Sequence, residues 1–96
     1  MKLPKKLNVF GQVVKVEYAK LDENIGGLSH SSGLIQINSK LLKKAVRQVF
    51  LHEFFHSVIT RLSIDQNMSI DTEEILVEGL SKCLLENFDV KVRKDH

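Results

Sequence analysis

The sequence has a single cysteine, a single proline, no tryptophan and no long apolar run. One cysteine excludes an intrachain disulfide, so a reducing, intracellular setting is expected rather than that of a disulfide-rich secreted domain. No segment approaches the ~20 consecutive apolar residues of a membrane span. The N-terminal lysines are followed by alternating polar and apolar residues, not by the apolar core of a signal peptide. We therefore expect a cytoplasmic protein with no membrane partner.

An excess of charge of one sign is also absent, because 14 basic residues face 12 acidic ones and the formal net charge is +2. The densest basic runs, MKLPKK (1–6) and KVRK (91–94), are short. A nucleic-acid-binding domain usually carries a basic stripe on one face, so no nucleic-acid partner is expected. The composition is that of a globular protein, with 43% hydrophobic residues. A chain of 96 residues predicts one domain spanning 1–96.

The first part of the chain has the two-residue period of β-strands. VVKVEY (13–18) alternates, and LNVF (7–10) before Gly11 is suited to be its hairpin partner. LIQIN (34–38) alternates in the same way, and HSSG (30–33) supplies the turn of a second hairpin. Four strands are therefore expected before residue 39.

The second part has the period of helices. A first helix is expected over 41–62, with Ser39 as its N-cap. It is apolar nearly all round over 50–58, which predicts a buried central helix. A second helix is expected over 72–88, with Asp71 as its N-cap. The predicted fold class is α+β, with a small antiparallel or mixed sheet that packs on these two helices.

Two histidines and a glutamate interrupt the apolar stretch VFLHEFFHSVI (49–59). His52 and His56 are four residues apart, so on a helix they share one face and can direct two imidazoles at one ion. Zn²⁺ suits such ligands. Glu53 would then project beside the ion, where it can act as a general base. The alternative without a metal treats both histidines as core residues and lets Glu53 reach solvent.

A catalytic zinc site has a third protein ligand, and the best candidates lie early in the second helix. Glu74 and Glu78 are one turn apart there. One carboxylate could bind the ion while the other orients a ligand histidine. The periodicity does not decide between them, and Glu73 stays open as a third candidate.

Simpler roles compete for several residues. Glu74 would occupy the capping-box position if Asp71 is the N-cap. Cys83, on an apolar helix face, is more typical of a small core residue than of a metal ligand. His30 lies in a predicted turn, and His96 is the last residue, so both are less suited to bind an ion.

In chain order, LIQIN, HEFFH and EILVEGLS resemble a gluzincin, specifically the small phage- and mobile-element-encoded peptidases of the ImmA/IrrE kind. The resemblance covers roughly residues 26–88. It implies a minimal zincin with one Zn²⁺ per chain. It also implies that His52, His56 and Glu74 bind the zinc, and that Glu78 orients a ligand histidine.

The expected function is zinc-dependent hydrolysis of peptide bonds, with a zinc-activated water and Glu53 as general base. The substrate would be a peptide or protein, and the resemblance implies a regulator such as a phage or host repressor. Strand 34–38 is expected to offer a free edge on which an extended peptide adds as a further strand. The alternative is a zinc-binding interaction protein, inactive or weakly active, that binds a regulator stoichiometrically.

Overall fold

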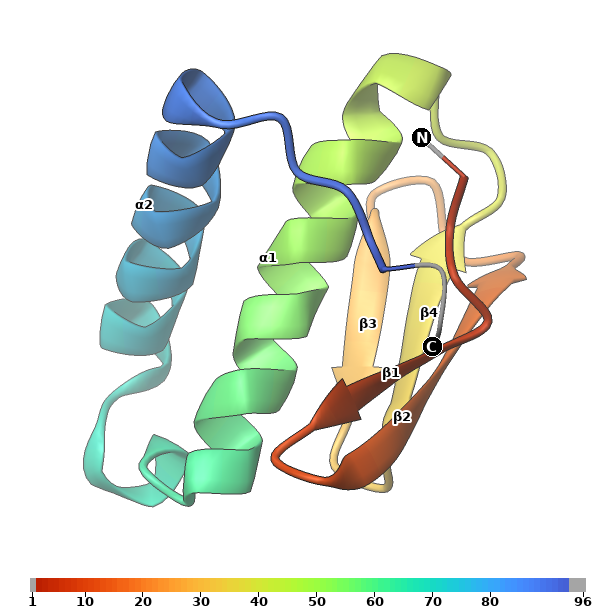
Figure 1. Ribbon diagram of the computed structural model, residues 1–96. Helices are drawn as coiled ribbons and strands as arrows, with labels where there is room; N and C mark the ends of the chain where they lie inside the picture. The colour runs from red at the N-terminus through yellow and green to blue at the C-terminus, as the bar shows by residue number, and fades with distance from the viewer. Residues whose placement is uncertain (1, 94–96) are drawn as a thin grey trace.

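The computed structural model describes residues 2–93. Four strands precede two long helices, which confirms the predicted α+β class (Figure 1). The elements are β1 (Lys6–Val9), β2 (Gln12–Ala19), β3 (Gly27–His30), β4 (Leu34–Asn38), α1 (Lys43–Leu62), the 3-10 turn η1 (Asp65–Asn67) and α2 (Ile70–Asn87). Within this part of the chain, no helix combines the length and the apolar character needed to cross a membrane.

The four strands form one mixed sheet in the order β1-β2-β4-β3. The two predicted hairpins are confirmed, because β1 pairs antiparallel with β2 and β3 pairs antiparallel with β4. The two hairpins join through parallel pairing of β2 with β4, which sets Val16 beside Ile35. The expected free edge at residues 34–38 is wrong, because β4 is paired on both sides. The free edge on that side of the sheet belongs to β3.

One face of the sheet packs against α1, and α2 lies on the far side of α1 (Figure 1). Alternate strand residues point toward α1, so Val14, Ile35 and Ile37 are completely buried. Phe50 of α1 packs into the same core. The prediction that the first helix is central is therefore confirmed.

Both helix starts differ from the prediction. The N-cap of α1 is Leu42, in extended conformation and without a side-chain cap, rather than Ser39. The N-cap of α2 is Ser69, whose Oγ accepts a hydrogen bond from the backbone N–H of Thr72 at 3.0 Å, rather than Asp71. Glu74 is therefore the fifth residue of α2 and is not at the capping-box position.

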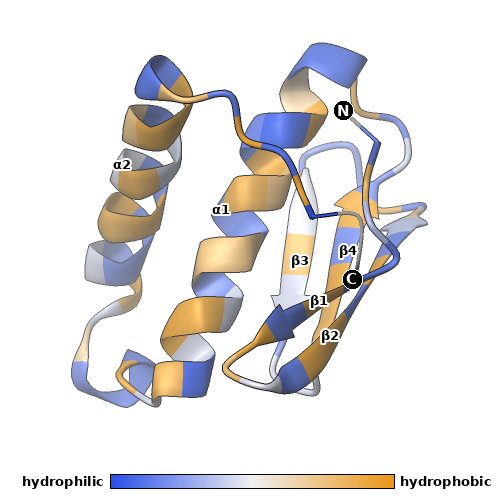
Figure 2. Cartoon of the chain, in the orientation of Figure 1, coloured by the Kyte–Doolittle hydropathy of each residue, from blue (hydrophilic) through white to orange (hydrophobic). Residues whose placement is uncertain are grey.

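Cys83 is exposed, so its prediction as a core residue is wrong. The reason is the position of α2, which packs chiefly against α1, while no element of residues 2–93 forms a layer on its other side. Within α2 only Val77 and Ser81 are buried. Leu84 and Leu85 are partly buried, whereas Ile75, Leu76 and Leu80 are exposed. Figure 2 shows hydrophobic residues along the length of this helix.

Candidate metal centre

The two histidines of the motif lie on successive turns of α1, on the side that faces α2. Glu73, Glu74 and Glu78 face them from the first half of α2. His52 contacts Glu78, and His56, one turn later in α1, contacts Glu74, one turn earlier in α2. This order is expected because the two helices run in opposite directions (Figure 1). Two helices thus present two imidazoles and three carboxylates to one another.

Three of these side chains converge on one point. The Nε2 atoms of His52 and His56 are 3.2 Å apart. Glu74 reaches both, with its Oε2 3.1 Å from Nε2 of His52 and its Oε1 2.9 Å from Nε2 of His56. One ligand atom from each of the three residues lies within 4.8 Å of the others. The structure therefore brings together the three residues that the sequence suggested as metal ligands.

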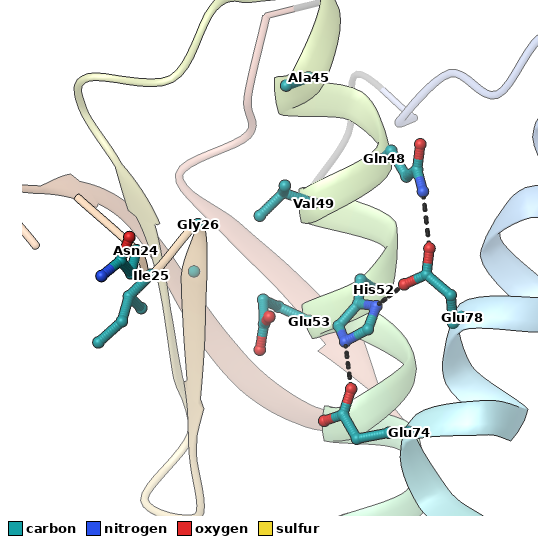
Figure 3. Close-up of a pocket in the computed structure, with 11 residues that line it drawn as sticks. Asn24, Ile25, Gly26, Ala45, Gln48, Val49, His52, Glu53, Glu74 and Glu78 are labelled. Atoms are coloured by element: carbon teal, nitrogen blue, oxygen red, sulfur yellow. Dashed lines mark hydrogen bonds and ion pairs between the residues drawn. The ribbon is translucent and has the colours of Figure 1, made fainter. Parts of the chain in front are cut away.

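The other nitrogen of each imidazole is held by a separate carboxylate. Nδ1 of His52 lies 2.8 Å from Oε2 of Glu78, as Figure 3 shows. Nδ1 of His56 contacts Oε2 of Glu73. Carboxylates in this position fix the orientation and tautomer of an imidazole. The placement of Glu78 agrees with the role that the resemblance implies, whereas the contact between Glu73 and His56 was not foreseen.

Glu78 is itself fixed by several neighbours. Gln48 of α1 donates a hydrogen bond from Nε2 to Oε1 of Glu78 at 2.8 Å, and Nζ of Lys82 is 3.5 Å from the same oxygen. Partial burial raises the pKa of Glu78. The charge of His52 and the hydrogen bonds from Gln48, His52 and Lys82 together lower it further, so the net pKa lies below its ordinary value. Glu78 is thus an ionised acceptor for the N–H of His52.

If both imidazoles are neutral, these contacts leave only hydrogen-bond acceptors at the point where the three side chains converge. An imidazole that donates Nδ1–H to a carboxylate and is neutral has an acceptor at Nε2. The two Nε2 atoms and the carboxylate of Glu74 are then all acceptors within 3.2 Å of a neighbour. Acceptors at this distance repel one another unless a cation or an added proton lies between them. Two imidazoles and a carboxylate are the donor set that Zn²⁺ favours.

Glu53 lies beside this point but joins none of its contacts. Its side chain is 8% exposed and points into the space between α1 and β3 (Figure 3). No hydrogen bond to its carboxylate is present among residues 2–93. Because no side-chain oxygen in this part of the chain is buried without a partner, the carboxylate oxygens reach the solvent of the clefts that Glu53 lines. Burial raises the pKa of Glu53 above its ordinary value, against the lowering by His56 and His52, and Glu74 raises it further. Glu53 is thus a largely buried residue whose carboxylate has no hydrogen-bond partner in the protein and opens into the clefts.

Gly27 of β3 allows the edge strand to approach Glu53 closely. A Cβ at this position would be 2.9 Å from Cγ of Glu53 and 3.0 Å from both Cγ1 of Val49 and the backbone oxygen of Gln36. Such contacts are closer than van der Waals packing permits. Only glycine therefore fits between α1 and the rest of the sheet at this point.

Two further polar contacts fix the walls around Glu53. Ser57, which is buried in α1, shares a hydrogen bond of 2.9 Å with Ser29 of β3 through their Oγ atoms. Asn38 is buried at the end of β4, and its Nδ2 lies 2.8 Å from the carbonyl oxygen of Ile25 and 3.1 Å from that of Asp22. Asn38 therefore holds the loop that leads into β3. Its place at the end of an alternating strand was the only sequence signal for this role.

Two clefts meet at Glu53. A cleft of about 430 Å³ extends on the His52 side (Figure 3), and one of about 290 Å³ extends on the His56 side. The first is lined by Asn24, Ile25, Gly26, Gly27, Ala45, Gln48, Val49, His52, Glu53, Glu74 and Glu78. The second is lined by Gly27, Leu28, Ser29, Glu53, His56, Thr60, Glu73 and Glu74. An extended ligand could therefore follow the free edge of β3 past the centre.

The remaining histidines do not join this group. His30 pairs with Gln36 on the sheet, at 2.8 Å between Nε2 and Oε1. His96 lies outside the described residues.

No protein-family model, curated protein or solved structure matches the chain. The resemblance to ImmA/IrrE-like peptidases thus rests on the three sequence motifs.

Proposed function

We propose that the protein is a zinc-dependent peptidase with a minimal zincin-like site. The observation that carries this proposal is the convergence of three acceptor groups, the imidazoles of His52 and His56 and the carboxylate of Glu74, beside the buried and unpartnered Glu53. The donor set fits Zn²⁺ in number and in type. A bound Zn²⁺ would supply Lewis acidity and a water of lowered pKa.

The residues of the chain divide the remaining tasks. Glu78 and Glu73 hold the Nδ1 atoms, so that each imidazole would keep its Nε2 available for a bound ion. The carboxylate of Glu53 accepts a proton from the attacking water and then donates it to the departing amine nitrogen. The raised pKa of Glu53 suits both steps, because it brings the group closer to neutral pH than an exposed glutamate would be.

The free edge of β3 is the proposed binding site for an extended peptide. The backbone of β3 would pair with the peptide as a further strand. Gly27 brings this strand close to Glu53, so a paired peptide bond would lie beside the base. The resemblance adds that the substrate is a regulatory protein. Because the chain has a single cysteine and thus no intrachain disulfide, we place this activity in the reducing environment of the cytoplasm.

A second function would use the same residues without hydrolysis. If both imidazoles were doubly protonated, they would form ion pairs with the three glutamates and need no metal. If zinc is bound but only structural, the chain would be an interaction protein. Neither alternative uses the carboxylate of Glu53, which opens into the cleft beside His52, and for this reason we favour the peptidase.

The test is cleavage of a peptide library made by trypsin digestion of a bacterial lysate, with new termini identified by mass spectrometry. The zinc-loaded parent should cleave a subset of peptides, and Glu53→Gln should bind zinc but lose at least 100-fold of this activity, as general base catalysis requires. Glu86→Gln, on the exposed side of α2, is the matched control and should cleave as the parent does. Equal cleavage by the parent and Glu53→Gln, or none by either when zinc is bound, would refute the peptidase.

A further inference from the structure

The outer face of α2 is hydrophobic but uncovered. Ile75, Leu76 and Leu80 are 75%, 40% and 43% exposed, and Gly79 and Cys83 are exposed as well. These five residues, called here the α2 outer face, follow one another at intervals that place them on one side of a helix. Val77 and Ser81, which pack on α1, are on the opposite side. Figures 1 and 2 show α2 as the outermost element, with hydrophobic residues along its length.

Gly79 lies at the centre of this face without an internal reason for being glycine. It is in the middle of a helix, where glycine is less stable than alanine. A Cβ built at Gly79 would meet nothing within 4 Å, so the packing of this chain does not require it. Glycine on a helix surface does allow the backbone of a second helix to approach closely.

We propose that the α2 outer face is the interface of a homodimer, in which two copies of α2 cross antiparallel at Gly79. A two-fold axis presents the same face on both subunits, which is the commonest symmetry of soluble oligomers. The proposal does not depend on the metal centre or on its function.

The charges of α2 favour the antiparallel arrangement. Its first half carries only acidic charges, at Asp71, Glu73, Glu74 and Glu78, whereas its second half carries Lys82 and Glu86. Parallel helices would set two acidic halves side by side. Glu73, Glu74 and Glu78 point toward the histidines of α1, so they act on a second copy only at a distance. Antiparallel helices that cross at Gly79 keep the two acidic halves apart and oppose the two helix dipoles.

The area of the face indicates a small interface, of the size that weak and transient complexes have. If a large apolar side chain has about 200 Å² of surface, the exposed fractions of Ile75, Leu76 and Leu80 amount to roughly 300 Å² per copy. With Gly79, Cys83 and the polar rim, the interface would bury about 1,000 Å² in total, which is near the lower limit for a specific complex. The dimer should therefore be reversible, with a Kd of about 1–100 µM.

Analytical ultracentrifugation of the metal-free protein from about 5 to 500 µM tests the proposal. The parent should change from monomer to dimer over this range, and Leu80→Glu should raise the Kd at least 30-fold. Ile70→Glu is the matched control, because Ile70 is apolar and 82% exposed but lies at the first position of α2, outside the face. It should dimerise like the parent.

Gly79→Ala gives a second test in which two effects have opposite signs. Alanine should stabilise the helix and raise the Tm of the dilute monomer by about 2–8 °C. The added methyl group should separate the crossing helices and raise the Kd at least 10-fold. A parent that is monomeric at 500 µM, an Ile70→Glu variant as impaired as Leu80→Glu, or tighter association of Gly79→Ala would each overturn the dimer. If the parent is monomeric at 500 µM, the α2 outer face would instead be a binding site for a different protein.

Discussion

Replacement of Glu53 by glutamine should stabilise the metal-free protein at neutral pH. In the folded state Glu53 is 8% exposed as a residue and its carboxylate has no hydrogen-bond partner among the described residues, whereas in the unfolded chain it is fully hydrated. The amide has nearly the same size but no charge. Because the carboxylate oxygens still reach the solvent of the clefts, removing this partly desolvated charge should raise the free energy of unfolding by about 1 kcal/mol. For a domain of this size that corresponds to an increase in Tm of about 4–8 °C.

The pH dependence of this effect follows from the raised pKa of Glu53. Its ordinary value is 4.5 and burial raises it in the folded protein, so folding favours the protonated form. Its contribution to stability is complete below the unfolded pKa and is lost as the pH rises through the folded pKa. The advantage of glutamine should therefore be near zero at about pH 4 and largest above neutral pH.

Thermal unfolding in EDTA, followed by circular dichroism at both pH values, measures the effect. Glu86→Gln removes a charge from an exposed glutamate of α2 and should leave the Tm within about 2 °C of the parent at both pH values. If Glu53→Gln lowered the Tm at neutral pH, Glu53 would have a stabilising partner. The description of Glu53 as a buried acid free to exchange protons would then be wrong.

Three further predictions test the surroundings of the centre. Glu78→Gln and Glu73→Gln should each weaken zinc binding by about 10–100-fold in isothermal titration calorimetry, because each carboxylate orients one histidine; an affinity unchanged from that of Glu86→Gln would contradict this. Gly27→Ala should lower the free energy of unfolding by about 1–3 kcal/mol, measured by urea denaturation. Gly26→Ala should lower it by less, because its Cβ would come no closer than 3.3 Å to Val49. A larger loss for Gly26→Ala than for Gly27→Ala would show that β3 can move away from α1. Zinc at 100 times its Kd should stabilise the parent by about 2.7 kcal/mol, an increase in Tm of roughly 10–20 °C; no increase would mean that the folded state does not bind the ion preferentially.

The periods of the sequence predicted the elements of the fold but not all of their pairings. Alternation located the strands and the two hairpins, because each strand buries one face only. The parallel pairing of β2 with β4 joins residues 19 positions apart, such as Val16 and Ile35, and local patterns do not record such contacts. The free edge was therefore assigned to residues 34–38 instead of β3.

Helix ends and burial were harder to predict for local reasons. Ser69 and Asp71 are both good N-cap residues, and the choice depends on which side chain reaches a free backbone N–H. Cys83 was expected in the core because its helix face is apolar. A single sequence does not show whether a second layer covers such a face, and in this chain none of the described residues does.

The candidate centre was predictable in part. The spacing of His52 and His56 was sufficient to place both imidazoles on one side of α1. The choice among the three glutamates needed the register of α2 against α1. In that register Glu74 faces both Nε2 atoms, while Glu73 and Glu78 each face one Nδ1.

The most direct test of the metal centre is the zinc content of the purified chain by native mass spectrometry, in the presence of a small molar excess of zinc. The parent and Glu86→Ala should each hold one Zn²⁺ per chain, whereas His56→Ala and Glu74→Ala should hold none under the same conditions. A parent that stays folded and free of zinc would contradict the metal centre, and the histidines would then be ion-pair partners of the glutamates. Zinc lost from His56→Ala but kept by Glu74→Ala would contradict the assignment of the third ligand.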